Sequence, residues 1–481
     1  MSKADPCLFY LHLEDKLVGI IALATDDMIH GGTEEHWKRM NQLQSRYKMG
    51  KFAVGGGRFA GKDVVKNDDG SFTLHQKFYI EDKINSVPLT KERSKKRYSK
   101  CTPEEITALR GIIGGLSWVA KETRPDIAGR VALLEQCMPE PQIFHIVEAN
   151  QILKDLKKDP ALGIRIQPIP VEHLRVGVVT DASWGNTENE RNYLEDNEHD
   201  YWEESATGWT RYHILPRRLR FHPAAAPGGP DLHEISTSRI TCTQENHEED
   251  DWNQKDSVRA LQEEAWTGAT YFEKKKVTEE KARPIQERHL QLNRTGSQGG
   301  YLVIYYDERM ERQTDPKMIT IAAWKSYKLK RCTVNTLSAE CQSMLQGIGQ
   351  VHWHRFMLCE TMGAEMELNT WEDQLRQVPF IAVTDSRSLY DTITKCRNSS
   401  AHIDDKRTAI DLSILKGDLV RTKGQVRWIE GKNMISDSLT KRMSSVFLRG
   451  IMSRGLWSLH EKGFESLADL HMLWATKVAA M

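Results

Sequence analysis

The chain has 481 residues, and its 67 Lys and Arg side chains are balanced by 67 Asp and Glu side chains. This length predicts two or three domains, and a net charge of zero argues neither for nor against a nucleic-acid partner. No apolar run approaches the roughly 20 residues that span a bilayer. The N-terminus lacks a signal-peptide pattern, and the eight cysteines show no zinc-like spacing. We expect a soluble intracellular protein, cytoplasmic or nuclear, with no membrane partner.

The first predicted element is a hairpin that carries two acids. The apolar run 17–24 predicts a strand, Asp26 and Asp27 follow it, and Met28 and Ile29 resume the apolar character. Two adjacent carboxylates at the tip of a hairpin could hold Mg²⁺, a hard cation that prefers oxygen ligands. A bare Asp-Asp pair is more commonly a polar turn, because Asp favours turns.

Helices and one further hairpin are expected before the middle of the chain. Residues 33–47 predict an amphipathic helix, and Asn-Asp-Asp-Gly at 67–70 predicts a hairpin turn. The basic run 91–100 is either a solvated linker or a contact for backbone phosphates. Helices should then fill 103–157, opened by a proline and two acids.

The segment 174–183, LRVGVVTDAS, predicts a buried strand because its β-branched valines suit a pleated surface. The strand ends on Asp181, and a charged side chain is rarely buried without a partner or a metal. Ligands bind at such strand ends in open α/β sheets. A lone acid there is more often the start of a turn, so the functional interpretation needs further acids at the same place.

From 187 to 298 the sequence is dense in charge and poor in periodicity. Acidic blocks and a Pro-, Ala- and Gly-rich stretch favour a mobile or partly ordered insertion over a packed domain.

A second set of regular elements follows the insertion. Residues 299–309 and 318–328 predict two strands of a hairpin, and 335–363 predicts a long amphipathic helix that Thr336 or Ser338 can cap. Glu340 lies in the first turn of this helix, where an acid commonly does no more than favour the helix dipole.

The strand predicted at 378–384 repeats the pattern of the first, because it too ends in Thr-Asp and a small residue, here with Asp385. Two such strands side by side would bring their carboxylates within reach of one metal. A last strand at 425–431 leads into a helix at 433–443 that holds Asp437, beside Lys441 and Arg442, which could touch phosphate.

The order of these segments resembles the C-terminal part of a copia-type retrotransposon reverse transcriptase followed by its ribonuclease H. The motifs that carry the resemblance are ADPCLF (4–9), ATDDMI (24–29), SFTLHQKFYIEDKI (71–84) and GIIGGLSWVAKETRPDIAGRVALL (111–134). The resemblance implies an α/β fold with a partial palm at 1–90 and thumb or connection helices at 91–171. It implies a ribonuclease H-like domain at 172–481, with a mixed five-stranded sheet, flanking helices and the charged insertion at about 187–298.

By this resemblance Asp26 and Asp27 occupy the palm positions that hold metal. The first catalytic carboxylate of the family has no counterpart in this sequence, and Ala24 replaces a tyrosine that supports the primer end. Two-metal phosphoryl transfer needs both cations in register. We therefore expect that this chain alone does not polymerise DNA, unless other Pol fragments supply the missing parts.

The resemblance also assigns four catalytic metal ligands, in the contexts TDASWG, LSAEC, VTDSRSL and ISDSLTKR. They are Asp181, Glu340, Asp385 and Asp437. Two Mg²⁺ ions, or Mn²⁺ in their place, would neutralise these acids and clamp the attacking water and the leaving 3′ oxygen of a phosphodiester. Asp181 would bridge both ions, and Asp437 would be the most mobile ligand. The implied substrate is an RNA–DNA hybrid.

Three residues are candidates for nucleic-acid contact: His402, which matches a His-Ile-Asp element of the family, and the basic pair Lys441 and Arg442. For His402 a surface loop histidine is an equally simple explanation. The alternative function is a catalytically inert, nucleic-acid-binding remnant of a retrotransposon polyprotein. An integrase-like or resolvase-like nuclease on the same fold is a third hypothesis, disfavoured by the helix-borne Glu340.

Overall fold

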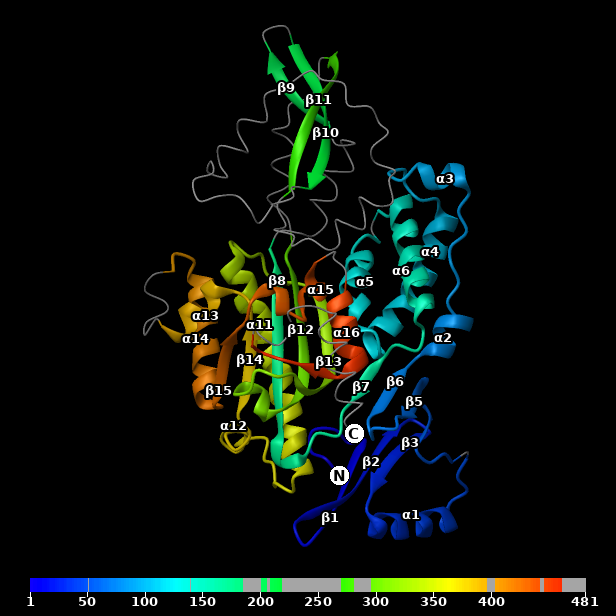
Figure 1. Ribbon diagram of the computed structural model, residues 1–481, viewed down its shortest axis with the longest axis vertical. Helices are drawn as coiled ribbons and strands as arrows, with labels where there is room; N and C mark the ends of the chain where they lie inside the picture. Colours follow the sequence, from blue (N-terminus) through cyan, green and yellow to red (C-terminus); the bar gives the residue numbers. More distant parts are fainter. Residues whose placement is uncertain are drawn as a thin grey trace. The chain divides into compact units, whose positions relative to one another are not determined.

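The chain forms two compact units, drawn in Figure 1. The larger unit comprises residues 1–187 and 296–481, and the smaller unit comprises residues 188–295. The computed structural model describes residues 1–50, 52–138, 140–184, 200–205, 208–218, 270–280, 296–395, 403–441 and 445–460.

The larger unit begins with a three-stranded antiparallel sheet in the order β1-β2-β3, followed by a helix. The elements are β1 (Leu8–Leu13), β2 (Lys16–Ala24), β3 (Asp27–Gly32) and α1 (Glu34–Arg46). The hairpin and the amphipathic helix expected from the sequence are both confirmed.

Four short strands form a second antiparallel sheet in the order β4-β5-β6-β7. They are β4 (Gly56–Phe59), β5 (Lys62–Lys66), β6 (Phe72–His75) and β7 (Ile164–Ile166). The turn predicted at 67–70 joins β5 to β6, and its last residue, Gly70, has a φ of 81°. Glycine adopts this left-handed conformation without a steric penalty, which explains its place in the turn.

A group of helices lies between β6 and β7 in the sequence. It contains α2 (Lys77–Asp82), α3 (Lys91–Lys95), α4 (Pro103–Glu122), α5 (Ala128–Glu135) and α6 (Ile143–Lys158). Thr102 and Glu105 form a capping box that fixes the start of α4. Arg93, from the basic run 91–100, pairs with Glu105 at 2.7 Å, so part of that run has a structural role.

The centre of the larger unit is a six-stranded mixed sheet in the order β15-β14-β8-β12-β13-β16. Strand β14 runs parallel to β8 and β15, and the other pairs are antiparallel. The strands are β8 (Leu174–Ser183), β12 (Gln298–Asp307), β13 (Lys317–Lys328), β14 (Phe380–Thr384), β15 (Gly424–Trp428) and β16 (Leu456–Trp457). Five strands were expected. The sixth strand, β16, has only two residues, too few to show the alternation of apolar and polar residues that predicts a strand.

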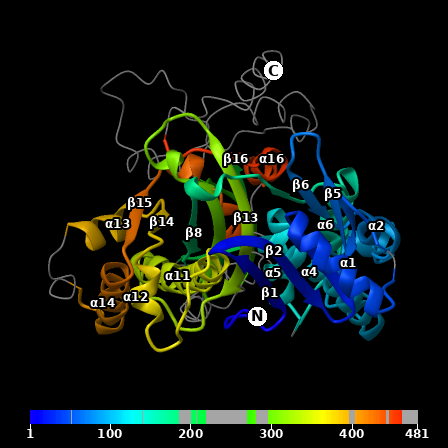
Figure 2. The ribbon, with the colours of Figure 1, turned by 90° about the horizontal axis from the view of Figure 1, so that it is seen from below.

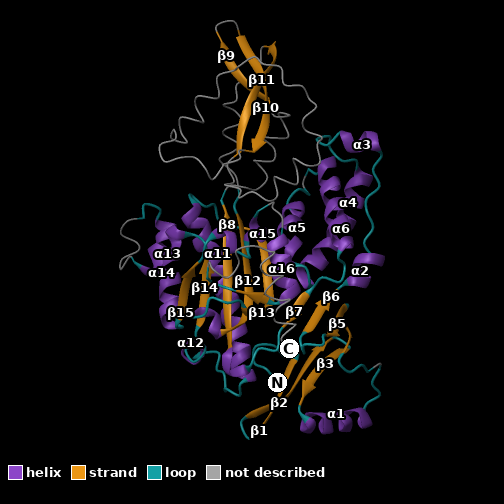
Figure 3. Cartoon of the chain, in the orientation of Figure 1, coloured by secondary structure: helices purple, strands orange, loops and turns teal. Residues whose placement is uncertain are grey.

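Helices cover both faces of this sheet, so the chain is an α/β protein (Figure 3). Figure 2 shows α11, α12 and α14 together on one face. These helices pack on the side chains of Val176 and Val178, while Val179 points into the core on the opposite face. The helices that follow β13 are α11 (Thr336–Thr361), α12 (Trp371–Leu375), α13 (Arg387–Thr394), α14 (Lys406–Arg421), α15 (Asp437–Thr440) and α16 (Val446–Arg454).

The core opposite α11 is shared between the N-terminal helices and the sheet. It joins Leu116 of α4 and Val131 of α5 to Leu302 of β12 and Leu439 of α15. The Trp324 indole of β13 also donates a hydrogen bond to the Ala120 carbonyl of α4, with a nitrogen–oxygen distance of 2.6 Å. The residues before 172 are therefore part of the same packed unit as the sheet.

The smaller unit contains a three-stranded antiparallel sheet in the order β11-β10-β9. Its strands are β9 (Asp200–Ser205), β10 (Gly208–Arg218) and β11 (Thr270–Glu280). The sequence analysis identified no strand here, because the dense charge hides the two-residue alternation on which strand prediction depends. Within the described ranges, every helix is too short or too polar to cross a bilayer.

Helix α11 approaches the sheet closely at Gly347. A Cβ atom placed on Gly347 would lie 2.8 Å from Thr180 Cγ2 and 2.9 Å from Val178 Cγ2, both on β8. Gly349, on the exposed side of the same helix, has no atom within 4 Å of such a Cβ.

We expect Gly347→Ala to lower the free energy of unfolding by about 1–3 kcal/mol, because the added methyl group forces α11 away from β8. Gly349→Ala should instead raise it by about 0.5–1 kcal/mol, because alanine favours the helix. Urea unfolding measures the free energy of unfolding of both variants. Equal changes in the two variants would contradict this packing of α11.

Candidate metal centre

Two neighbouring parallel strands place Asp181 and Asp385 at the same end of the sheet. In the register of β8 and β14, Val179 pairs with Val383, and each acid lies two residues further along its strand direction. Alternate residues of a strand share a face, so Asp181 lies on the same face of β8 as Val179. Asp385 is the first residue after the end of β14. The strand-end pattern seen in the sequence therefore has the expected spatial result.

Glu340 approaches from α11, whose start is fixed by Asn335. The Asn335 side chain accepts a hydrogen bond from the Ser338 amide at 2.8 Å, so the expected cap at Thr336 or Ser338 is wrong by one or more residues. Further along α11, the Ser343 hydroxyl donates a hydrogen bond to the Asp181 carbonyl oxygen at 2.9 Å and connects the helix to β8.

Three of the four predicted acids form one group. Ligand oxygens of Asp181, Glu340 and Asp385 all lie within 4.8 Å of one another. Asp181 and Glu340 are buried, with 1% and 6% of their surface exposed, and Asp385 is partly buried. One divalent cation can therefore reach all three carboxylates.

Asp437 is the first residue of α15 and joins this group through its charge and through Lys441. Burial, and then the negative charge of Asp181, raise the pKa of Asp437 to about 7. Lys441 Nζ lies 2.7 Å from Asp437 Oδ1 and 3.5 Å from Asp181 Oδ2. The Thr440 hydroxyl donates to Asp181 Oδ2 as well. The four predicted acids thus interact electrostatically at one end of the sheet.

The environment of these acids disfavours their charged forms. Burial raises the pKa of Glu340 well above its ordinary value, and the charges of Asp181 and Asp385 raise it further. Burial, and then Asp181, also raise the pKa of Asp385. Like charges in a group of buried carboxyls repel unless protons or cations neutralise them.

The donor set fits a hard divalent cation. Glu340 Oε2 is buried and accepts no hydrogen bond from the described residues, which leaves a carboxylate oxygen for a metal. The group supplies carboxylate oxygens alone, which suit Mg²⁺ or Mn²⁺ better than a soft metal.

Asp26 and Asp27 lie on the β2–β3 hairpin, as the sequence predicted, and both are exposed. Asp27 Oδ2 accepts a hydrogen bond from the Ala60 amide at 2.9 Å. Among the described residues, neither acid belongs to a group of three side chains that could share one ion.

The three residues expected to contact nucleic acid have different outcomes. Lys441 is described, and its ammonium group contacts the acids. His402 and Arg442 lie outside the described residues.

Sequence reasoning missed several residues that hold the acids in place. The Trp428 indole nitrogen donates to the Asp385 carbonyl oxygen at 2.9 Å, and Ser343 and Thr440 each contact Asp181. Trp428 ends a strand and Ser343 lies in a helix, and neither position carries a motif that announces a hydrogen bond. Thr440 belongs to the motif around Asp437, which was the one available signal.

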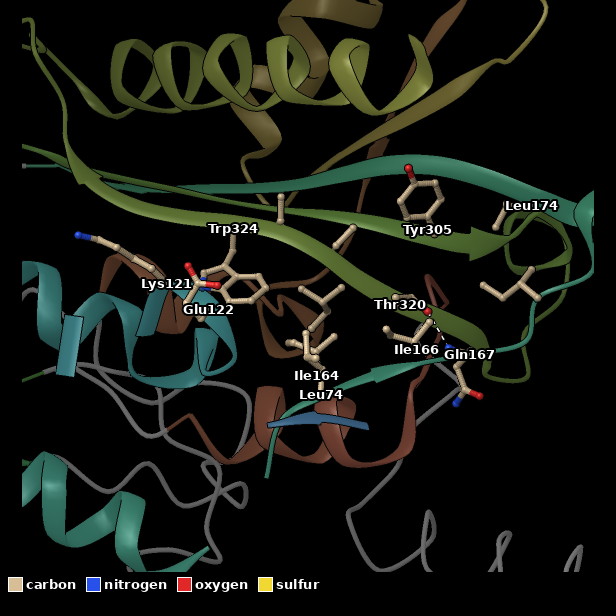
Figure 4. Close-up of a pocket in the computed structure, with 14 residues that line it drawn as sticks. Leu74, Lys121, Glu122, Ile164, Ile166, Gln167, Leu174, Tyr305, Thr320 and Trp324 are labelled. Carbon is tan, nitrogen blue, oxygen red and sulfur yellow. Dashed lines mark hydrogen bonds between the residues drawn. The ribbon is translucent and has the colours of Figure 1, made fainter. Parts of the chain in front are cut away.

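A pocket of about 570 Å³ lies away from the acids (Figure 4). Its lining includes Ile164 of β7, Trp324 of β13 and the adjacent charged residues Lys121 and Glu122 at the end of α4. None of the four acids lines it, so the pocket and the candidate metal centre are separate features.

The sequence is similar in part to that of a transposon protein. A putative transposon Ty5-1 protein of Saccharomyces cerevisiae is 26% identical to the chain over 192 residues. The match covers 37% of this chain and 60% of that protein, so the chain spans about three fifths of its relative's length. No protein-family model and no solved structure matches the chain.

The raised pKa of Asp437 predicts a specific dependence of stability on pH. Because the folded chain binds this proton more tightly than the unfolded chain, the metal-free protein should lose stability as pH rises from about 3.8 to about 7. Asp437→Asn should remove at most about 4 kcal/mol of this loss, since one pKa unit corresponds to about 1.4 kcal/mol. Urea unfolding at several pH values in this range, with a chelator present, measures the free energy of unfolding of both proteins. An identical dependence of that free energy on pH would contradict the burial of Asp437.

Proposed function

We propose that the chain is a metal-dependent ribonuclease H of retrotransposon origin that cleaves the RNA strand of RNA–DNA hybrids. The observation that carries the proposal is the convergence of Asp181, Glu340 and Asp385 within 4.8 Å, with Asp437 coupled to them. These acids come from a strand, a helix, a second strand and a second helix, in the order that the resemblance to copia-type polyproteins implies.

The topology of the sheet supports the same proposal. Strands β8, β12 and β13 form an antiparallel meander, and β14 and β15 add in parallel on the other side of β8. A mixed sheet of five strands is what the resemblance implies, so this arrangement supports the proposal. The similarity to a transposon protein is in keeping with it.

The residues present could carry out phosphodiester hydrolysis with divalent cations. Bound Mg²⁺ or Mn²⁺ supplies Lewis acidity and lowers the pKa of bound water. Asp181 lies centrally, because the other three acids all interact with it. Thr440 donates a hydrogen bond to the Asp181 carboxylate and orients it. Ser343 and Trp428 donate to the backbone carbonyls of Asp181 and Asp385 and hold the backbone at these two residues. Discrimination of hybrid from duplex DNA would rest on the 2′-hydroxyl groups and the groove shape.

The N-terminal region, in this proposal, is a partial reverse transcriptase without polymerase activity of its own. Asp26 and Asp27 are exposed on their hairpin, and no third acid among the described residues gathers with them. The helices α4 and α5 share a core with the sheet. We infer that the region between 91 and 171 serves the candidate metal centre as structural support.

An inert remnant is the second candidate, and one observation favours it. The raised pKa values of Glu340, Asp385 and Asp437 would allow these carboxyls to persist as protonated acids without any metal. Such a protein would bind hybrid or duplex through basic surfaces and would not cut it.

The purified chain should cleave RNA in a hybrid only when Mg²⁺ or Mn²⁺ is present. Asp385→Asn should lower the cleavage rate by about a hundredfold or more, because it removes a charged metal ligand. Asp373→Asn, which changes an exposed acid of α12, should cleave like the wild type. A gel assay with labelled RNA measures the cleavage rates of the wild type and of both variants. Undiminished metal-dependent cleavage by Asp385→Asn would argue strongly against the proposal.

Metal binding also separates the nuclease from the inert remnant. A ligand that binds the folded state at a hundredfold excess over its Kd adds about 2.7 kcal/mol to the free energy of unfolding. We expect Mn²⁺ to raise the midpoint of thermal unfolding of the wild type but not of Glu340→Gln. A wild type that shows no response to either Mg²⁺ or Mn²⁺ would favour the remnant.

A further inference from the structure

The ammonium group of Lys441 contacts two of the four acids, as a bound metal ion would. It is 2.7 Å from Asp437 Oδ1 and 3.5 Å from Asp181 Oδ2. Burial lowers the pKa of Lys441, but the charges of Asp181 and Asp437 outweigh this effect and raise it above its ordinary value. The side chain is therefore charged at neutral pH and partly neutralises both carboxylates.

This contact differs from an ordinary ion pair between neighbouring turns of a helix. Asp391 of α13 and Lys395, the residue that follows this helix, form such a pair at 3.0 Å, with 35% and 61% of their side chains exposed. Lys441 is 39% exposed, and its second partner, Asp181, is only 2% exposed. A charge beside a buried carboxylate is screened less and acts more strongly.

Lys441 divides the candidate centre into two unequal halves. In the first half, Asp181, Glu340 and Asp385 come within 4.8 Å of one another, and Glu340 Oε2 accepts no hydrogen bond from the described residues. In the second half, between Asp181 and Asp437, the Lys441 ammonium already contacts both carboxylates. A divalent cation can enter the first half directly, whereas the second half requires the ammonium to leave.

We propose that Lys441 is an internal cation that holds the place of one divalent ion and competes with it for Asp181 and Asp437. This inference rests on the proposed function, because it assumes that the acids bind metal. Lysine suits the role, since its compact charge sits on a flexible stem that can swing toward solvent. The two ions then bind in sequence, the second more weakly than the first, and the displaced ammonium is free to meet a substrate phosphate.

The test is a calorimetric titration of the full chain with Mn²⁺ alone, without nucleic acid, at about pH 8, where ordinary carboxyls are ionised. The wild type should bind one ion tightly and one weakly. Lys441→Met, which keeps the length but removes the charge, should tighten the weak step by at least about fivefold, the effect of one unit charge at 4 Å in water.

Two further variants serve as controls. Lys395→Met removes the equivalent charge from the exposed pair with Asp391 of α13 and should bind Mn²⁺ like the wild type. Lys441→Arg keeps the competing charge and should show no tightening. Thermal unfolding in a chelator checks that Lys441→Met folds, and Lys441→Gln replaces it in the titration if it does not.

The outcomes separate this inference from the proposed function. If the wild type binds Mn²⁺, Asp385→Asn abolishes the tight step, and neutral variants of Lys441 bind no more tightly than the wild type, the competing role of Lys441 is wrong while the metal centre stands. If the wild type binds no Mn²⁺, both the metal centre and the role of Lys441 are wrong.

Discussion

The repulsion between buried carboxylates is the constraint on which the rest of this structure depends. Asp181 and Glu340 are almost fully buried, and Asp385 and Asp437 add negative charge nearby. Removing charged groups from water is costly unless they are paired or bind a cation. Lys441 contacts two of these acids and neutralises part of their charge, and in our proposal divalent ions neutralise the rest.

Holding these acids together requires close packing from both sides of the sheet. On one face, Gly347 lets α11 approach β8 and bring Glu340 to the strand end. On the other face, Gly300 of β12 and Gly129 of α5 leave the space that α15 fills, since a Cβ atom on either would collide with Leu439 or its neighbours. The short helix with Asp437 is therefore wedged between the sheet and the N-terminal helices, which links the two regions of the larger unit.

A buried ion pair strengthens the same link. Arg124 and Asp126 of the Thr-Arg-Pro-Asp motif are each about 1% exposed and pair at 2.7 Å. Arg449 of α16 lies 3.7 Å from the same carboxylate. Removing one partner of a buried pair leaves an uncompensated charge, so this motif constrains how α16 meets the N-terminal helices. This part of the segment 111–134, one of the motifs that carry the resemblance, thus has a packing role in the chain.

The sequence revealed the strands and the acids more fully than it revealed their support. Asp181 and Asp385 were identifiable because each follows a β-branched strand with the same Thr-Asp pattern, and the period of α11 located Glu340. Asp437 lies in a helix of four residues, shorter than the helix predicted at 433–443, and only the resemblance assigned it a role as a metal ligand. The inward position of Lys441, the two-residue strand β16 and the Asn335 cap depend on tertiary contacts that a local pattern does not contain.

The most direct test of the central claim is anomalous diffraction from crystals of the chain grown with Mn²⁺ and a non-cleavable hybrid. The account predicts two anomalous peaks about 3.5–4 Å apart, one bound by Asp181, Glu340 and Asp385 and the other by Asp181 and Asp437. The absence of any peak within bonding distance of these four carboxylates would contradict it.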